Sequence, residues 1–183
     1  SILQTRADRA FVDNAVDQTG ITSAAAFAAQ DAGNARQAID LLRVGGEVAE
    51  KQGDTTVVDD HIEEASTIVK RGRLENRIRD QTDHAQYILE AIAILEANGE
   101  TPVRSKAIQA CYEEVASANA TDPLTTLKSI QDHLSELQML GFLTRYERNE
   151  GRSGGVYYEY ELDLDAETVI EVRKQIEGEH EFE

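Results

Sequence analysis

The stretch LTTLKSIQDHLSELQMLGFLTRYERNEGRSGGVYYEYELDL occupies residues 124–164 and contains two different hydrophobic periodicities. Before Gly141 the apolar residues recur at helical spacing, which predicts a helix opened by Asp122-Pro123. Its inward face is expected to contain Leu127, Ile130, Leu134, Leu137 and Leu140. After the glycine-rich turn 151–155 the pattern alternates strictly, which predicts the second strand of a hairpin. The apolar face of that strand is expected to contain Val156, Tyr158, Tyr160, Leu162 and Leu164.

The segments on either side of this stretch complete a recognisable order. Apolar spacing predicts helices over residues 85–95 and 105–118, and a last helix with Val169, Val172 and Ile176 inward. Three helices followed by a glycine-rich hairpin is the order of a winged helix. Residues 84–183 are therefore expected to form a winged-helix DNA-binding domain with a small β-hairpin wing.

The preceding half of the chain is expected to be helical throughout. Apolar residues at helical spacing predict four helices within residues 1–69, with breaks at Gly20, residues 33–34 and residues 53–54. Thr22 or Ser23 is the expected N-cap of the second of these. Residues 70–83 contain the densest basic stretch and are expected to be a connecting helix or a linker. The fold class is therefore mainly α, a helical domain followed by a winged helix.

The net charge of the chain is unusual for a DNA-binding protein. Thirty-five acidic residues face 18 basic ones, giving −17, and only five of the basic residues are lysines. One interpretation is that the chain does not touch DNA. The other is adaptation to a salty cytoplasm, where scattered acids maintain solubility and salt screens their repulsion over about 3 Å at 1 M.

Three groups of polar residues are candidates for contact with a duplex. Short polar side chains on the outward face of the third helix can bond to bases or phosphates: Thr125, Thr126, Lys128, Ser129 and Gln131. The hairpin supplies arginines and a turn that allows close backbone approach: Arg145, Arg148, Arg152, Ser153 and Gly154. The start of the second helix offers free N–H groups beside Arg104, Ser105 and Lys106.

The charge of the winged-helix half leaves other functions open. Residues 81–183 carry a net charge of −13, although ten of their 21 acids lie at 159–183, and Asp132 and Glu136 belong to the third helix itself. One alternative is a protein-interaction module that docks a helicase or an initiator partner. Another is a transcription regulator with a helical dimerisation domain.

A second candidate site lies in the helical half. Arg36, Asp40, Arg43 and Glu47 share one helix face by their spacing, which is typical of a salt-bridged solvent stripe. Arg36 is also in the first turn of its helix, where a guanidinium and free N–H groups can meet an anion such as the γ-phosphate of ATP. Spacing alone favours the first interpretation.

A family resemblance connects these features. The segment GNARQAIDLLRVGGEVAE at residues 33–50 closely resembles the second sensor motif in the lid of archaeal origin-recognition and helicase-loader ATPases. Residues around Ile2–Phe11 and Val58–Ala65 resemble the same lid, and residues 124–143 and 151–155 resemble the family's recognition helix and wing. The family usually has GDAR where this chain has GNAR, which removes one charge.

The resemblance implies roles for both halves. Residues 1–69 would be an ATPase lid in which Arg36 senses the nucleotide, and residues 125–133 and 145–155 would bind duplex origin DNA. The chain contains no GxxxxGK[ST] loop, so it is expected to be the C-terminal part of a longer protein that binds ATP with magnesium. No cofactor and no catalytic residue are expected in this part alone. Expected partners are a replicative helicase or other initiator subunits.

Cysteine content and hydropathy bear on the compartment. Cys111 is the only cysteine, so no internal disulfide is possible, and a single thiol fits a cytoplasmic protein. No run of about 18 apolar residues suggests a membrane span. The four histidines are far apart, so no metal site is expected.

Overall fold

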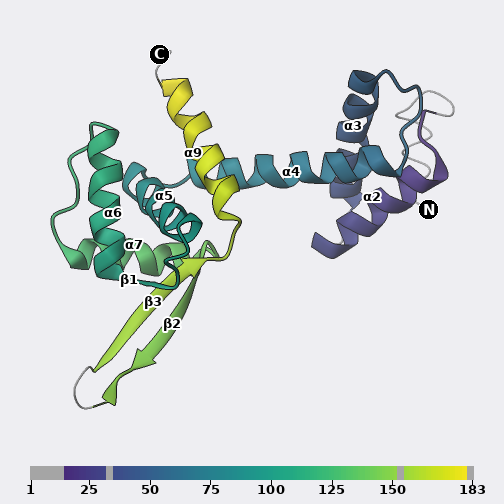
Figure 1. Ribbon diagram of the computed structural model, residues 1–183. Helices are drawn as coiled ribbons and strands as arrows, with labels where there is room; N and C mark the ends of the chain where they lie inside the picture. The colour runs from purple at the N-terminus through teal and green to yellow at the C-terminus, as the bar shows by residue number, and fades with distance from the viewer. Residues whose placement is uncertain (1–14, 32–34, 152–154, 181–183) are drawn as a thin grey trace. The chain divides into compact units, whose positions relative to one another are not determined.

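The computed structural model describes residues 15–31, 35–151 and 155–180 (Figure 1). They belong to two compact units, residues 1–74 and residues 75–183. Helix α4 (Asp59–Arg79) contributes residues to both units, and the basic stretch after Val69 is its second half. Among the described residues, no helix combines the length and the apolar character needed to cross a membrane.

The first unit packs α2 (Gln18–Asp31), α3 (Ala35–Gln52) and the start of α4 around a small core. That core contains Ile21, Ala24, Leu41, Leu42, Ala49, Val57 and Ile62. Helix α3 is clearly amphipathic, because its buried residues recur every three or four positions. Ile68 of α4 follows Ile62 and Ala65 at helical spacing, yet it is 45 % exposed. The helix expected from residue 2 lies almost entirely outside the described residues.

Helix α2 begins earlier than its sequence suggested. Asp17 acts as its cap, because the Asp17 carboxylate accepts hydrogen bonds from the Thr19 hydroxyl at 2.6 Å and from the Gly20 N–H at 2.8 Å. These bonds lower the pKa of Asp17. Thr22 lies inside the helix, where its hydroxyl donates to the carbonyl of Gln18. The predicted break at Gly20 and the predicted cap at Thr22 or Ser23 were therefore wrong.

Gly20 allows α2 to lie directly on the chain at Val57. Val57 forms a parallel bridge with Val16, and its N–H donates to the Ala15 carbonyl at 2.7 Å. A Cβ at Gly20 would lie 2.9 Å from the Val57 carbonyl oxygen. Because that oxygen belongs to the backbone, it cannot move aside as a flexible side chain would.

We expect Gly20→Ala to lower the free energy of unfolding by about 1–2 kcal/mol, since overpacking outweighs the gain in helix propensity. The matched control is Gly72→Ala in α4, where a Cβ would meet no atom within 4 Å. That change should raise stability by about 0.5–1 kcal/mol. Chemical denaturation of the two variants measures both effects, and equal stabilisation by both would contradict the close contact at Val57.

The second unit is built on α5 (Asp83–Ala97), which packs against α6 (Ser105–Ala118), α7 (Leu127–Met139) and α9 (Ala166–His180). Ile88, Leu89 and Ile92 of α5 are fully buried. Beside the helices lies an antiparallel sheet of β1 (Val103–Arg104), β3 (Val156–Leu162) and β2 (Leu143–Asn149), in that order. The mainly helical class and the winged-helix order predicted from the sequence are confirmed.

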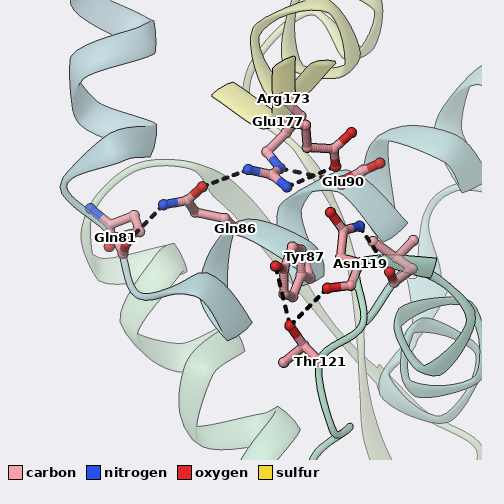
Figure 2. A network of polar contacts seen from close by, with 9 residues as sticks. Gln81, Gln86, Tyr87, Glu90, Asn119, Thr121, Arg173 and Glu177 are labelled. Carbon is pink, nitrogen blue, oxygen red and sulfur yellow. Dashed lines mark hydrogen bonds and ion pairs between the residues drawn. The ribbon is translucent and has the colours of Figure 1, made fainter. Parts of the chain in front are cut away.

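Helix α9 is held on α5 by a buried arginine. Arg173 is 3 % exposed and donates to Gln86 at 2.7 Å, to Glu90 at 3.2 Å and to Glu177 at 3.0 Å, as Figure 2 shows. Its guanidinium also lies 5.1 Å from the centre of the Tyr87 ring. Burial and the nearby Glu177 raise the pKa of Glu90 despite the opposing effect of Arg173. The arginine thus compensates a desolvated carboxylate.

Helix α7 is shorter than predicted at its start. Residues 121–126 belong to no helix or strand, and the helix begins at Leu127 with Thr126 as its N-cap, so Asp122-Pro123 does not open it. Leu127 and Leu140, predicted to point inward, are 37 % and 47 % exposed. Only the central positions Ile130, Leu134 and Leu137 are buried.

Candidate nucleic-acid interface

The first turns of α7 present an exposed polar surface. Thr126 accepts a hydrogen bond from the Ser129 N–H at 3.1 Å, and the hydroxyls of the two residues lie 2.8 Å apart. Lys128 is exposed and forms an ion pair of 2.8 Å with Asp132. Thr125 and Gln131 are also exposed, while Ser129 is half-buried. The capped helix start therefore offers donors and acceptors on one side, with its buried face toward α5 and α6.

The chain that leads into α7 is positioned by a buried tyrosine. The Tyr112 hydroxyl lies 2.8 Å from His84 Nδ1 and accepts a hydrogen bond from the Leu124 N–H at 2.9 Å. Burial raises the pKa of Tyr112, so the hydroxyl keeps its proton. One side chain of α6 thus connects α5 to the segment before α7. Sequence reasoning missed this residue, because a tyrosine in an apolar pattern looks like ordinary core.

The two strands of the wing form a ribbon that extends beyond the helices (Figure 1). Leu143 pairs with Leu162 at the base, and Asn149 pairs with Val156 near the turn. The base is buried, whereas Val156 and Tyr158 are 56 % and 37 % exposed. These two residues were predicted on an apolar face. They lie in the half of β3 nearer the turn, where the ribbon no longer packs against the core.

The register divides the candidate arginines between the two faces of the ribbon. Arg145 pairs with Tyr160 and lies 4.5 Å from the centre of the Tyr158 ring. Arg148 pairs with Tyr157 on the other face, because side chains alternate along a strand. Arg104 of β1 pairs with Glu159 and therefore shares the face of Arg148. Arg145 and Arg148, predicted together as hairpin arginines, thus lie on opposite faces, and Arg148 shares its face with Arg104, which was predicted in the separate group at the start of α6.

On the face of Arg104 and Arg148, each arginine meets a carboxylate of the chain. Arg104 donates to Glu150 at 2.8 Å and lies 3.5 Å from the centre of the Tyr157 ring. Arg148 donates to Glu159 at 2.9 Å. A hydrogen bond with Tyr157 raises the pKa of Arg104, and one with Glu159 raises that of Arg148. Cations and anions are thus interleaved on this face.

The start of α6 is adjacent to β1. Arg104 occupies the N-cap position, and its side chain makes no capping hydrogen bond. Ser105 is 9 % exposed, while Lys106 is exposed. Arg104 and Lys106 are therefore the accessible cations of this predicted phosphate site, and Arg104 is paired with Glu150.

In the first unit, Arg36 lies in the first turn of α3 and is exposed. Arg43 lies about two turns further along the same helix. It forms an ion pair of 3.0 Å with Asp40 and another with Glu47. The salt-bridged stripe expected from the spacing is therefore present around Arg43. Arg36 forms no ion pair with another residue of the described ranges.

The predicted DNA-binding residues that can be placed all lie in the second unit. Helix α7 packs against β2, so the helix that carries the polar residues and the wing are neighbours within the second unit. Arg152, Ser153 and Gly154 lie outside the described residues. Glu150 and Tyr157 were not predicted, and their alternation with arginines along the hairpin is the signal that could have identified them.

Two family descriptions match consecutive parts of the chain. The "Cdc6 AAA+ ATPase-type lid domain" matches residues 1–67, and the "CDC6, C terminal winged helix domain" matches residues 76–172. The chain therefore belongs to the Cdc6 family, and it contains the lid and the winged helix in that order. The family predicted from the sensor-like motif and the wing is confirmed.

Relatives and solved structures agree with this assignment. The "ORC1-type DNA replication protein 8" of Halobacterium salinarum is 45 % identical over 171 residues, and "ORC1-type DNA replication protein 11" of Haloarcula marismortui is 40 % identical over 169 residues. These matches cover 93 % and 92 % of this chain. They cover 43 % and 41 % of those relatives, so the chain spans less than half of their length.

A structure of the Aeropyrum pernix ORC1 protein in complex with DNA superimposes with a TM-score of 0.77 at 34 % identity. The match covers 95 % of this chain and 45 % of that one. The chain thus corresponds to the C-terminal region of ORC1/Cdc6-type replication initiators. Its relatives include proteins of halophilic archaea, in keeping with its acidic composition.

We expect Tyr112→Phe to lower the free energy of unfolding of the second unit by about 1–2 kcal/mol. The change removes the partner of the Leu124 N–H and the bond to His84. Tyr158→Phe, on the exposed ribbon, is the control and should change stability by less than about 0.5 kcal/mol. Urea denaturation measures both. Equal stability of the two variants would show that the Tyr112 hydroxyl does not hold the segment before α7.

Proposed function

We propose that the second unit binds duplex DNA for a replication initiator, with the start of α7 in a major groove and the wing along the adjacent minor groove. The observation that carries the proposal is a helix with an exposed polar start that packs against a strand of an arginine-bearing ribbon, in a chain similar to an initiator structure that contains DNA. An α-helix fits the major groove, and arginines favour narrow minor grooves.

The proposed contacts fall into two classes. Residues at the start of α7 contact base edges and the phosphates beside them: Thr125, Thr126, Lys128, Ser129 and Gln131. Residues of the wing and of the α6 start contact phosphates or the minor groove: Arg104, Ser105, Lys106, Arg145, Arg148, Arg152, Ser153 and Gly154. Base contacts determine sequence preference, whereas phosphate contacts determine overall affinity.

Two substitutions separate these classes. A duplex selected from a random-sequence library by the chain itself is the probe, and fluorescence anisotropy measures its affinity. Lys106→Ala should weaken binding to selected and scrambled duplexes by the same factor, since it removes a phosphate contact. Gln131→Ala should reduce the preference for the selected duplex by about 1–3 kcal/mol.

The control is Lys174→Ala, an exposed lysine of α9 outside the proposed surface. It loses the same charge and should retain wild-type affinity within about twofold. Equal losses from Lys106→Ala and Lys174→Ala would mean that only net charge matters. Failure to select any duplex at any salt concentration would refute DNA binding.

We propose that residues 1–69 act as an ATPase lid, that residues 70–83 connect it to the winged helix of residues 84–183, and that Arg36 contacts the γ-phosphate of bound ATP. Supporting observations are the match to an AAA+ lid family, the position of Arg36 in the first turn of α3 and its exposure. The sequence contains no phosphate-binding loop, so the nucleotide and its magnesium require a core beyond these residues. The whole initiator would act in the cytoplasm.

In a protein that carries an ATPase core before this chain, we expect Arg36→Ala to lower ATP affinity or turnover at least tenfold. A lost charged contact to phosphate is worth about 1.5–3 kcal/mol. Arg43→Ala is the control, because Arg43 is already paired with Asp40 and Glu47. Equal effects of the two substitutions on ATP binding would exclude a special role for Arg36.

A second candidate function is docking of a helicase or another initiator subunit. A cavity of about 790 Å³ lies between α5, α6 and α9, with no lining residue from α7 or the strands. Its walls combine apolar side chains such as Ile94 and Val115 with carboxylates such as Glu90 and Glu114. A docking role without DNA binding would leave every duplex unprotected in footprinting, which distinguishes it from the first proposal.

A further inference from the structure

The wing contains a carboxylate partner for each of two arginines, Arg104 and Arg148. Central strand β3 carries Tyr157 and Glu159, and each edge strand contributes one arginine to that same face, Arg104 from β1 and Arg148 from β2. Arg148 meets Glu159 at 2.9 Å. The face that carries both arginines therefore has little uncompensated positive charge.

Glu150 holds Arg104 in a closed arrangement of three side chains. One Glu150 oxygen, Oε1, accepts from Arg104 Nη2 at 2.8 Å and from the Tyr157 hydroxyl at 2.8 Å. The Arg104 guanidinium lies over the Tyr157 ring at 3.5 Å from its centre. Side chains of Arg104 and Glu150 are about half exposed, at 52 % and 51 %. Glu150 and Tyr157 thus position the Arg104 guanidinium, which remains accessible from solution.

A DNA phosphate that approaches either arginine encounters the carboxylate already bound to it. Two negative groups about 4 Å apart repel by about 1 kcal/mol in water, so the freed carboxylate favours a cation from solution. Ordinary phosphate contacts release about 0.9 cation each from DNA, and affinity therefore falls as salt rises. Uptake of a cation by the carboxylate opposes that release.

We propose that Glu150 and Glu159 are positioning residues that make DNA binding by the wing an exchange of ions, in which a phosphate replaces the carboxylate on Arg104 or Arg148 and the carboxylate takes up a monovalent cation. This proposal rests on the proposed function. The cation joins the diffuse ion atmosphere and needs no fixed site. As a result, the wing arginines bind DNA with little dependence on salt, where unpaired arginines would lose affinity.

The test measures affinity for the selected duplex between 0.2 and 2 M KCl, with the whole chain as wild type, Glu150→Gln and Glu159→Gln. Removing either carboxylate should make the plot of log affinity against log salt steeper by about one. The ratio of variant to wild-type affinity then falls about tenfold over this range, because the variant binds more tightly at low salt. Glu150→Asp retains the charge and should restore the wild-type slope.

Glu167→Gln is the matched control, since it removes one exposed carboxylate of α9 away from the ribbon and should leave the slope unchanged. Parallel plots for wild type, Glu150→Gln and Glu159→Gln, with DNA binding retained, would overturn the exchange and leave the proposed function intact. Absence of DNA binding at every salt concentration would overturn the proposed function and the exchange with it. The thermal unfolding midpoint of each variant is measured as well. An unchanged midpoint verifies that the salt dependence of DNA affinity is compared between folded proteins.

Discussion

The pairing register of β3 is the constraint on which the second unit depends. Because Leu143 pairs with Leu162, one face of the ribbon carries the buried leucines of the base together with Arg145, and the other face carries Arg148 and Glu159. A shift of one residue would exchange these faces and expose the leucines. The register also brings Arg104 of β1 beside Tyr157, although more than 50 residues separate them in sequence. The strand register therefore determines both which residues of the wing are buried and which of its charged residues meet.

The acidic composition and the DNA-binding family no longer conflict once the charges are placed. Glu150 and Glu159 form ion pairs with arginines of the wing, so the net charge of the whole chain does not describe the charge of this face of the ribbon. A strongly acidic protein in high salt loses long-range repulsion, and short contacts then decide recognition. Under the proposed function, paired arginines on the ribbon suit that condition, because the ion pairs position them.

Sequence periodicity predicted the winged-helix order and the amphipathic character of α3, since each element there buries one continuous face. Prediction failed at element ends. Gly20 was taken for a break, yet it lies inside α2 because a close backbone contact requires its missing side chain. Leu127 and Leu140 fit the helical spacing of α7, but they lie at its two ends and are 37 % and 47 % exposed. Periodicity indicates which face of a helix a residue occupies. It does not indicate whether another helix or strand covers that position.

The amino-acid sequence by itself determined the fold class, the order of the two halves and the family, because these depend on local patterns and on motifs read along the chain. Only the tertiary structure decided which charges meet. The strand register puts Arg145 and Arg148 on opposite faces of the wing. The hydrogen bonds from Arg104 to Glu150 and from Leu124 to Tyr112 join residues of different parts of the chain. Such contacts follow from strand register and helix packing, which bring together distant residues that no local pattern relates.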